Sequence, residues 1–167
     1  ELDIDNEYIM SPKDLCTIHF LNKMLDAGVR VLKLEGRARS PEYVYTVVKC
    51  YKEAVQSYFE GSYSKDKIDV WMEQLKTVFN RGFWDGYYLG QRLGEWSHVY
   101  GSQATRKKMY VGKGMNYFSK IGVAEFLCEA TDLEVGDEIL ITGPTTGVVQ
   151  SKVEEIQVDH KNVQKAE

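Results

Sequence analysis

The first half of the chain alternates between short apolar runs and longer helical patterns. Apolar residues recur at helical spacing over 15–25, over 44–58 and over 68–79. A short apolar run at 7–10 comes before the first helical pattern, and a β-branched run at 29–34 comes before the second. We therefore predict the order strand, helix, strand, helix, which is typical of parallel β/α folds.

Two serine–proline pairs indicate where helices begin. Ser11 and Ser40 are each followed by a proline, and serine is a good N-cap while proline suits the first helical position. Gly28 and Gly61 follow the patterns at the positions where a left-handed cap would end a helix. The first helix is thus expected to begin at Ser11.

Polar loops are expected after the two predicted strands. In β/α folds, ligands bind at the carboxyl ends of the strands. The loops 11–14 and 35–39 follow the predicted strands directly. We therefore expect both loops on one rim of the fold.

The pattern changes from about Gly82 onward. Residues 82–90 are aromatic and glycine-rich, and 91–107 show no clear period, which predicts a linker. Short alternating strands follow, which suggest a small barrel or sandwich. We predict three regions: a partial β/α-barrel segment over 1–90, a linker over 91–107, and a truncated small β-barrel over 108–167.

Composition narrows the class of protein. The 167 residues are 43% hydrophobic and 28% charged, with a net charge of −4, so a packed core is expected and a nucleic-acid coat is not. Three widely spaced cysteines without a CxxC pair favour a reducing compartment. No apolar run approaches the roughly 18 residues of a membrane span, and no signal peptide is visible. We expect a cytoplasmic protein with no membrane partner, and the first residue, Glu1, suggests an internal fragment.

A complete catalytic motif is not visible in the sequence. The three histidines are scattered, no pair has metal-ligand spacing, and neither HExxH nor GxSxG occurs. A local basic run at 106–108 is either a contact for RNA or part of a solvated linker. We expect this fragment to be inactive by itself.

Four segments resemble the collagenase-like peptidase family U32. They are MSPKDLC at 10–16, KLEGRARSPEYV at 33–44, NRGF at 80–83 and NYFSKIGVA at 116–124. The resemblance implies the C-terminal piece of a β/α (TIM-like) barrel followed by a β-barrel similar to the second domain of translation factors. The family name records collagenase-type proteolysis, whereas better-understood relatives support oxygen-independent hydroxylation of tRNA uridine, ribosomal RNA or a quinone precursor.

The family also suggests a cofactor. Several members carry a 4Fe-4S cluster on four cysteines, but the cysteine-rich signature of the family would lie upstream of this sequence. Cys16 lies in a family-like segment and in the first turn of its predicted helix, where the helix dipole favours a thiolate ligand. The alternative for Cys16 is a small buried hydrophobic residue. A 4Fe-4S cluster is expected in the full-length protein and no cofactor in the fragment.

Candidate substrate-binding residues come from the two polar loops. They are Lys13, Glu35, Arg37 and Arg39. Arginine grips phosphate or carboxylate through a forked pair of hydrogen bonds, which suits an RNA backbone or an anionic co-substrate. The alternative is a structural role, in which an arginine forms an ion pair with Glu35 or interacts with a helix end. Catalytic residues cannot be assigned from the sequence.

Three functions follow as hypotheses. The first is tRNA uridine hydroxylation or another RNA modification, with the β-barrel docking tRNA or another RNA. The second is a collagenase-like peptidase acting on a protein substrate, and the third is a non-catalytic binding module. The chain stops soon after a predicted turn at 159–162, so the barrel is expected to lack a strand and to self-associate through its open edge.

Overall fold

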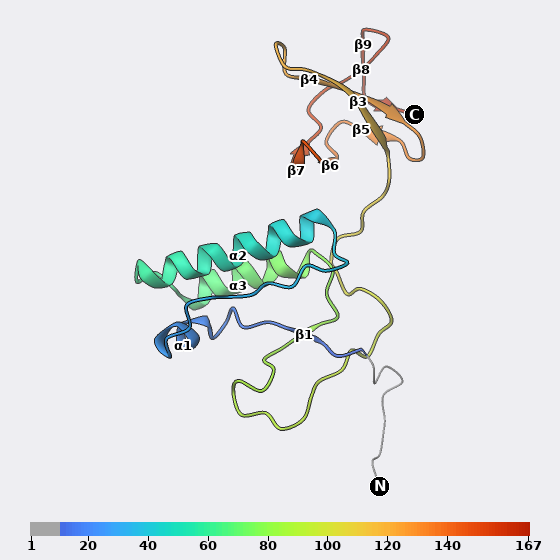
Figure 1. Ribbon diagram of the computed structural model, residues 1–167. Coiled ribbons are helices and arrows are strands. Elements are labelled where there is room, and N and C mark those ends of the chain that lie inside the picture. Colours follow the sequence, from blue (N-terminus) through green and yellow to red (C-terminus); the bar gives the residue numbers. More distant parts are fainter. Residues whose placement is uncertain (1–10) are drawn as a thin grey trace. The chain divides into compact units, whose positions relative to one another are not determined.

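The computed structural model describes residues 11–167, and the chain divides between Arg106 and Lys107 into two units (Figure 1). The division falls at the end of the segment 91–107 that the sequence marks as a linker. The predicted strand at 7–10 lies outside the described residues. None of the helices in the described part combines the length and apolarity needed to cross a membrane.

Three helices form most of the first unit. They are α1 (Leu21–Asp26), α2 (Pro41–Phe59) and α3 (Lys65–Lys76). Ser40 precedes α2 with Pro41 in its first turn, as predicted, and the side chain of Ser64 accepts a hydrogen bond from the backbone of Lys67 at the start of α3. The predictions of a second and a third helix are therefore confirmed. Figure 1 shows α2 and α3 side by side, joined by a short turn.

The prediction that the first helix begins at Ser11 is wrong. Residues 14 and 15 form strand β1 (Asp14–Leu15), which pairs in parallel with β2 (Phe83–Trp84). The backbone N–H of Asp14 donates to Gly82, and that of Cys16 donates to Trp84. These long-range hydrogen bonds occupy the groups that a helix would need, so α1 begins only at Leu21.

The prediction of a strand over 29–34 is also wrong, because this segment, which lies within the described residues, forms no strand. The segment lies along the helices instead, and Leu32 and Leu34 pack against the buried core while Val31 is exposed. The apolar residues of this run are thus only partly buried, and the segment has no strand partner in the part that the structure describes.

A single buried cluster holds the first unit together. It draws side chains from the segment after β1 and from all three helices. Its members are Cys16, Ile18, Leu21, Leu25, Cys50, Tyr51, Ala54, Trp71 and Leu75. The stripe along α2 and α3 that faces this cluster repeats at helical spacing, which is why the sequence pattern locates both helices.

The second unit consists of antiparallel strand pairs. The pairs are β3 (Gly112–Phe118) with β4 (Val123–Cys128), β6 (Glu138–Gly143) with β7 (Gly147–Lys152), β8 (Ile156–Val158) with β9 (Lys161–Val163), and β5 (Leu133–Glu134) with β10 (Lys165–Ala166).

Two details explain how the β3–β4 hairpin is built. A Cβ atom at Gly112 would lie 1.8 Å from the carbonyl oxygen of Leu127, so only glycine allows this approach of the two strands. The register shifts between Gly114 and Asn116, and Gly122 lies in the turn with a φ of +70°. Each sheet in the described residues has two strands. The β/α-barrel segment and the truncated β-barrel remain predictions.

Candidate functional site

A set of charged residues lies at the amino ends of β1 and β2. The backbone N–H of Arg81 donates to Oδ2 of Asp14 at 2.8 Å, and Nη2 of Arg81 lies 3.3 Å from Oδ1 of the same carboxylate. Next to this pair, Nζ of Lys13 lies 2.6 Å from Oε2 of Glu95. The hydrogen bond from Lys13 lowers the pKa of Glu95, which favours the charged carboxylate.

Arg39 connects the loop before α2 to this charged set. Its guanidinium carbon lies 3.8 Å from the ring centroid of Phe79 and 5.7 Å from that of Tyr43. Burial raises the pKa of Tyr43, and the negative charge of Asp14 raises it further, while Arg39 opposes both effects. Asp14 and Arg39 therefore both act on Tyr43. We call Lys13, Asp14, Arg39, Tyr43 and Arg81 the polar cluster.

Glu35 and Arg37 form a local turn rather than an ion pair with each other. Oε1 of Glu35 accepts a hydrogen bond from the backbone N–H of Arg37 at 2.7 Å, and the N–H of Arg39 donates to the carbonyl of Gly36 at 3.0 Å. Both Glu35 and Arg37 are exposed. Of the four predicted substrate-binding residues, Lys13 and Arg39 thus belong to the polar cluster, while Glu35 and Arg37 shape the loop that leads into it.

Cys16 is buried in the core, with 3% of its surface exposed. Its Sγ lies 3.8 Å from Sδ of Met72 and 3.9 Å from the hydroxyl of Tyr51. Burial raises the pKa of the Cys16 thiol and so disfavours the thiolate. The argument from a helix start is wrong, because Cys16 follows a strand and precedes α1 by several residues.

The residues around Cys16 do not fit an iron–sulfur cluster. No group of three or more histidine, cysteine, aspartate or glutamate side chains is arranged to hold a metal ion in residues 11–167. Cys50 is buried in the same core, and Cys128 belongs to the second unit. Ligation of a cluster by Cys16 remains a prediction about a longer protein, which would have to supply the other ligands.

One close pair of polar side chains was not predicted from the sequence. Nε2 of His19 lies 2.7 Å from Oδ1 of Asp85, although 66 positions separate the two residues in the chain. Phe20 lies against the edge of His19, and Tyr88 lies near Phe20. The sequence search looked for histidines spaced as metal ligands, and a histidine paired with a distant carboxylate has no such spacing. Only the parallel pairing of β1 with β2 brings the two together.

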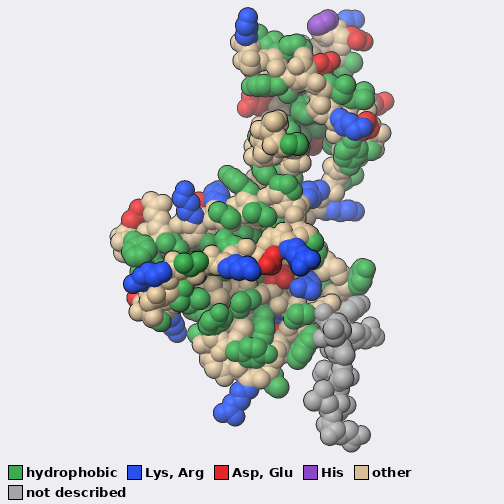
Figure 2. All heavy atoms as spheres, viewed as in Figure 1, with side chains coloured by type: hydrophobic (Ala, Val, Ile, Leu, Met, Phe, Trp, Pro, Cys, Tyr) green, Lys and Arg blue, Asp and Glu red, His purple; other side chains and the backbone are tan. Residues whose placement is uncertain are grey.

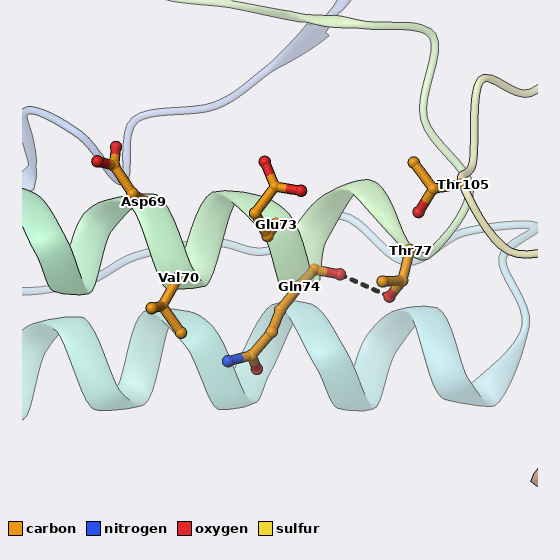
Figure 3. Close-up of a pocket in the computed structure, with 6 residues that line it drawn as sticks. All are labelled: Asp69, Val70, Glu73, Gln74, Thr77 and Thr105. Carbon is orange, nitrogen blue, oxygen red and sulfur yellow. Dashed lines mark hydrogen bonds between the residues drawn. The ribbon is translucent and has the colours of Figure 1, made fainter.

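A shallow hollow on α3 lies outside these residues (Figure 3). In Figure 3, Val70 and Gln74 point toward α2, while Asp69 and Glu73 point to the other side of α3. Lysines on the same helix already pair with these two carboxylates. The hollow offers no aromatic ring and no nucleophile other than threonine hydroxyls, so the polar cluster is the better candidate.

Acidic and basic side chains also lie next to one another on the visible face of the helical unit (Figure 2).

The comparison with known families concerns mainly the first unit. The model of peptidase family U32 matches residues 1–98, which include every predicted site residue as well as His19 and Asp85. The chain belongs to peptidase family U32.

Known relatives of this U32 chain carry two kinds of name. A protein named collagenase from Porphyromonas gingivalis is 69% identical over 99% of the chain and 40% of its own length. An uncharacterized protease of Methanocaldococcus jannaschii is 34% identical over 98% of the chain and 40% of its own length. The tRNA hydroxylation protein P1 of Bacillus subtilis is 30% identical over 84% of the chain and 33% of its own length.

The chain therefore spans 40% of the length of the Porphyromonas and Methanocaldococcus relatives. No solved structure matches it. What the whole protein does must accordingly be argued from the residues that this chain contributes.

Proposed function

We propose that this chain is a substrate-binding part of a longer U32 protein that acts on tRNA, and that Arg37 and Arg39 contact the RNA backbone. The observation that carries the proposal is the fixed position of Arg39 on Phe79. A guanidinium held over a ring loses little freedom when it binds, and its N–H groups can still donate hydrogen bonds to an anion. Arg37, two residues earlier, is exposed and adds a second positive charge.

A phosphate backbone is the ligand that two neighbouring arginines recognise well. Most contacts between proteins and nucleic acids position the backbone, and arginine forms paired hydrogen bonds with phosphate oxygens. The carboxylates of Asp14 and Glu95 hold Arg81 and Lys13, so these basic groups organise the cluster more than they attract RNA. Because the overall charge of the chain is negative, RNA binding is expected at local sites such as this one and not over the whole surface.

The names of several relatives support an RNA substrate. Besides the Bacillus protein, the tRNA hydroxylation protein P of Haemophilus influenzae is 26% identical over 96% of this chain. The second unit offers a further RNA contact, since Tyr117 and Phe118 on β3 are exposed and Lys113 lies on the same strand. Exposed rings beside basic groups suit stacking of unpaired bases. With tRNA as the substrate, we propose a cytoplasmic location.

A second candidate is a collagenase-like peptidase. It is favoured by the 69% identity to the protein named collagenase, which extends over 99% of this chain. In that case Arg39 would bind a carboxylate of the protein substrate. Under either function, we propose that the chemistry is completed by residues beyond this chain, including any iron–sulfur cluster.

The test is binding of unmodified tRNA to the full chain and to the variants Arg37→Gln and Arg39→Gln. We expect each substitution to weaken binding and to reduce the slope of log affinity against log salt by about one phosphate contact. Arg30→Gln is the matched control, because Arg30 is exposed on the same unit, does not belong to the polar cluster and donates a hydrogen bond to the neighbouring backbone of Val29.

Two results would overturn the RNA proposal. One is an unchanged affinity and salt slope in both arginine variants, and the other is no tRNA binding even at low salt. Binding of gelatin that is lost in Arg39→Gln but kept in Arg30→Gln would establish the peptidase candidate instead.

A further inference from the structure

The outer edge of β4 has no strand partner in the described residues. β4 runs from Val123 to Cys128, and the sheet that it forms there with β3 has two strands. Figure 1 shows the two strands as one hairpin. An edge of this kind presents a row of backbone N–H and C=O groups with which another strand can pair.

Two contacts show which backbone groups of β4 face this edge. The backbone N–H of Glu129 donates to the carbonyl of Val111 at 2.8 Å, and a Cβ atom at Gly112 would lie 1.8 Å from the carbonyl oxygen of Leu127. The groups of residues 127 and 129 therefore point toward β3. Because these groups alternate from side to side along a strand, the next ones point to the free edge. They belong to Ala124, Phe126 and Cys128.

Other strand edges in this unit carry features that discourage pairing, and β4 does not. The register of β3 shifts between Gly114 and Asn116, and such a bulge protects an edge. β7 ends in the polar run 150–152, which includes a lysine, and lysine has the same effect. β4 has no glycine or proline and carries one charge, on Glu125, and residues 123–127 are exposed. This composition is typical of a segment that pairs with another strand.

The sequence of β4 is suited to pairing with itself. When a two-fold axis relates two antiparallel strands, the residue on the axis lies opposite its own copy. An axis at Glu125 would place two like charges opposite each other, which is destabilising. An axis at Phe126 instead places the two rings opposite each other and Glu125 opposite Leu127. Aromatic pairs across strands are stabilising, so both charge and side-chain contact favour the axis at Phe126.

We propose that the chain forms a two-fold dimer in which β4 pairs antiparallel with β4 of a second copy, with Phe126 on the axis. The outward groups of Ala124, Phe126 and Cys128 then form hydrogen bonds across the interface, and the two hairpins become one continuous sheet. This inference goes beyond the proposed function, because it does not depend on RNA. The self-association expected from the sequence concerned an edge left open at the end of the chain, whereas this interface uses an earlier strand.

The first experiment removes one outward N–H group from β4. Ala124→Pro deletes a donor at the free edge and leaves the groups that face β3, so the hairpin should persist. Sedimentation equilibrium of the full chain should show a dimer in equilibrium with the monomer. The substitution should weaken dimerisation by roughly tenfold or more, because each dimer loses the hydrogen bond twice. Ala124→Val keeps the N–H group and is the matched control, and thermal melts check that both variants fold.

The second experiment tests the register by disulfide formation. Both variants are made in a Cys128→Ser chain, so that the native thiol at the interface cannot react. Phe126→Cys places two thiols at directly opposite positions, where the Cα atoms are about 5.5 Å apart, and should give a covalent dimer under mild oxidation. Val123→Cys is the control, because Val123 is exposed on the same strand but its two copies would lie about 20 Å apart in this register.

Each of the following results would overturn the proposed dimer. A chain that stays monomeric at its highest soluble concentration has no such interface, and a dimer that survives Ala124→Pro uses another surface. Equal cross-linking through positions 123 and 126 would reject the register. A monomer in which the N–H of Phe126 exchanges slowly with solvent would show that a segment of the same polypeptide covers the edge. The expected binding of tRNA through Arg39 would stand in every case, since Arg39 belongs to the first unit.

Discussion

The two units of this chain bury their apolar residues in very different ways. The first unit encloses a continuous core between the segment after β1 and its helices. In the second unit, Val153 and Ile156 are the buried hydrophobic residues, while Met115, Tyr117 and Leu127 remain exposed. Hydrophobic side chains are accordingly visible on the surface in Figure 2.

The physical reason lies in how each element is covered. Two packed helices each shield one face of the other, and the chain before them closes the third side. A two-stranded hairpin has a satisfied backbone ladder but two open faces, and such a pair is marginally stable alone. Side-chain packing therefore stabilises the first unit, whereas backbone pairing accounts for most of the order in the second.

The largest expected effect contrasts one leucine from each unit. Leu21→Ala removes a side chain that is fully buried, whereas Leu127→Ala removes one that is 50% exposed. We expect the first change to lower the free energy of unfolding by about 3 kcal/mol and the second by less than about 1 kcal/mol. All three tryptophans belong to the first unit, so their fluorescence during chemical denaturation reports on it selectively, and circular dichroism reports on the strands. Equal losses would show that the second unit has a core as complete as that of the first.

A smaller effect is expected from one buried hydroxyl of the first unit. The hydroxyl of Tyr51 accepts a hydrogen bond from the backbone N–H of Thr17 at 2.9 Å and lies 3.2 Å from its Oγ1. Tyr51→Phe leaves this buried N–H without a partner, so the free energy of unfolding should fall by about 1–2 kcal/mol in chemical denaturation. Tyr45→Phe is the control on the same helix, because Tyr45 is exposed, and its effect should be within about 0.5 kcal/mol. Similar effects from both changes would mean that the hydroxyl of Tyr51 does not hold the segment after β1.

The thiols should distinguish the two units by their reactivity. Burial raises the pKa of Cys50 to about 11 and also raises that of Cys16, whereas Cys128 is only half-buried. A thiol reagent at pH 8 should therefore modify Cys128 first, as mass spectrometry of the labelled peptides would show. Rapid labelling of Cys16 at pH 8 would instead favour a reactive thiol that could serve as an iron–sulfur ligand over a buried core residue.

The raised pKa of Cys50 also gives a pH dependence with a definite sign. The unfolded thiol loses its proton near its ordinary value of 9, before the folded one does, so the stabilisation is complete below about pH 9 and is lost as the pH rises toward about 11. Cys50→Ala should remove this part of the decline in a series of melts. A decline of the same size in the variant would assign it to other groups.

The smallest effect concerns the segment 91–106, which makes contacts along the first unit. The backbones of Lys13, Asn80 and Lys76 pair with Glu95, Gln103 and Thr105. Trypsin should therefore cut the chain around Lys107 before it cuts after Arg92. Glu95→Gln weakens the ion pair with Lys13 and should speed cleavage after Arg92 modestly, as gel electrophoresis of timed digests would show. Cleavage after Arg92 first in the unchanged chain would support a linker over the whole of 91–107.

Local signals allowed the long helices to be predicted from the sequence. The serine–proline start of α2 and the apolar stripes of α2 and α3 depend only on neighbouring residues. The prediction of the first helix failed because it depends on distant residues: the backbone N–H groups of Asp14 and Cys16 donate to residues about 70 positions away. No local pattern carries that information.

The candidate site, too, could be predicted from the sequence only in part. Arg39 and Lys13 could be selected because basic residues stood in polar loops next to predicted elements. That Arg39 lies on Phe79, and that both Arg39 and Asp14 act on Tyr43, could not be predicted, since these contacts join separate segments. His19 and Asp85 were not recognised as a pair for this same reason.

The sequence by itself determined the two long helices, α2 and α3, and the resemblance to family U32, because both depend on neighbouring residues or on short motifs. Only the tertiary structure decided that Cys16 is a buried thiol, that residues 29–34 lie without a strand partner in the described part, and that His19 meets Asp85. Burial and long-range pairing depend on which distant segments compete for the same backbone groups and the same core space. That competition is resolved only when the whole chain folds.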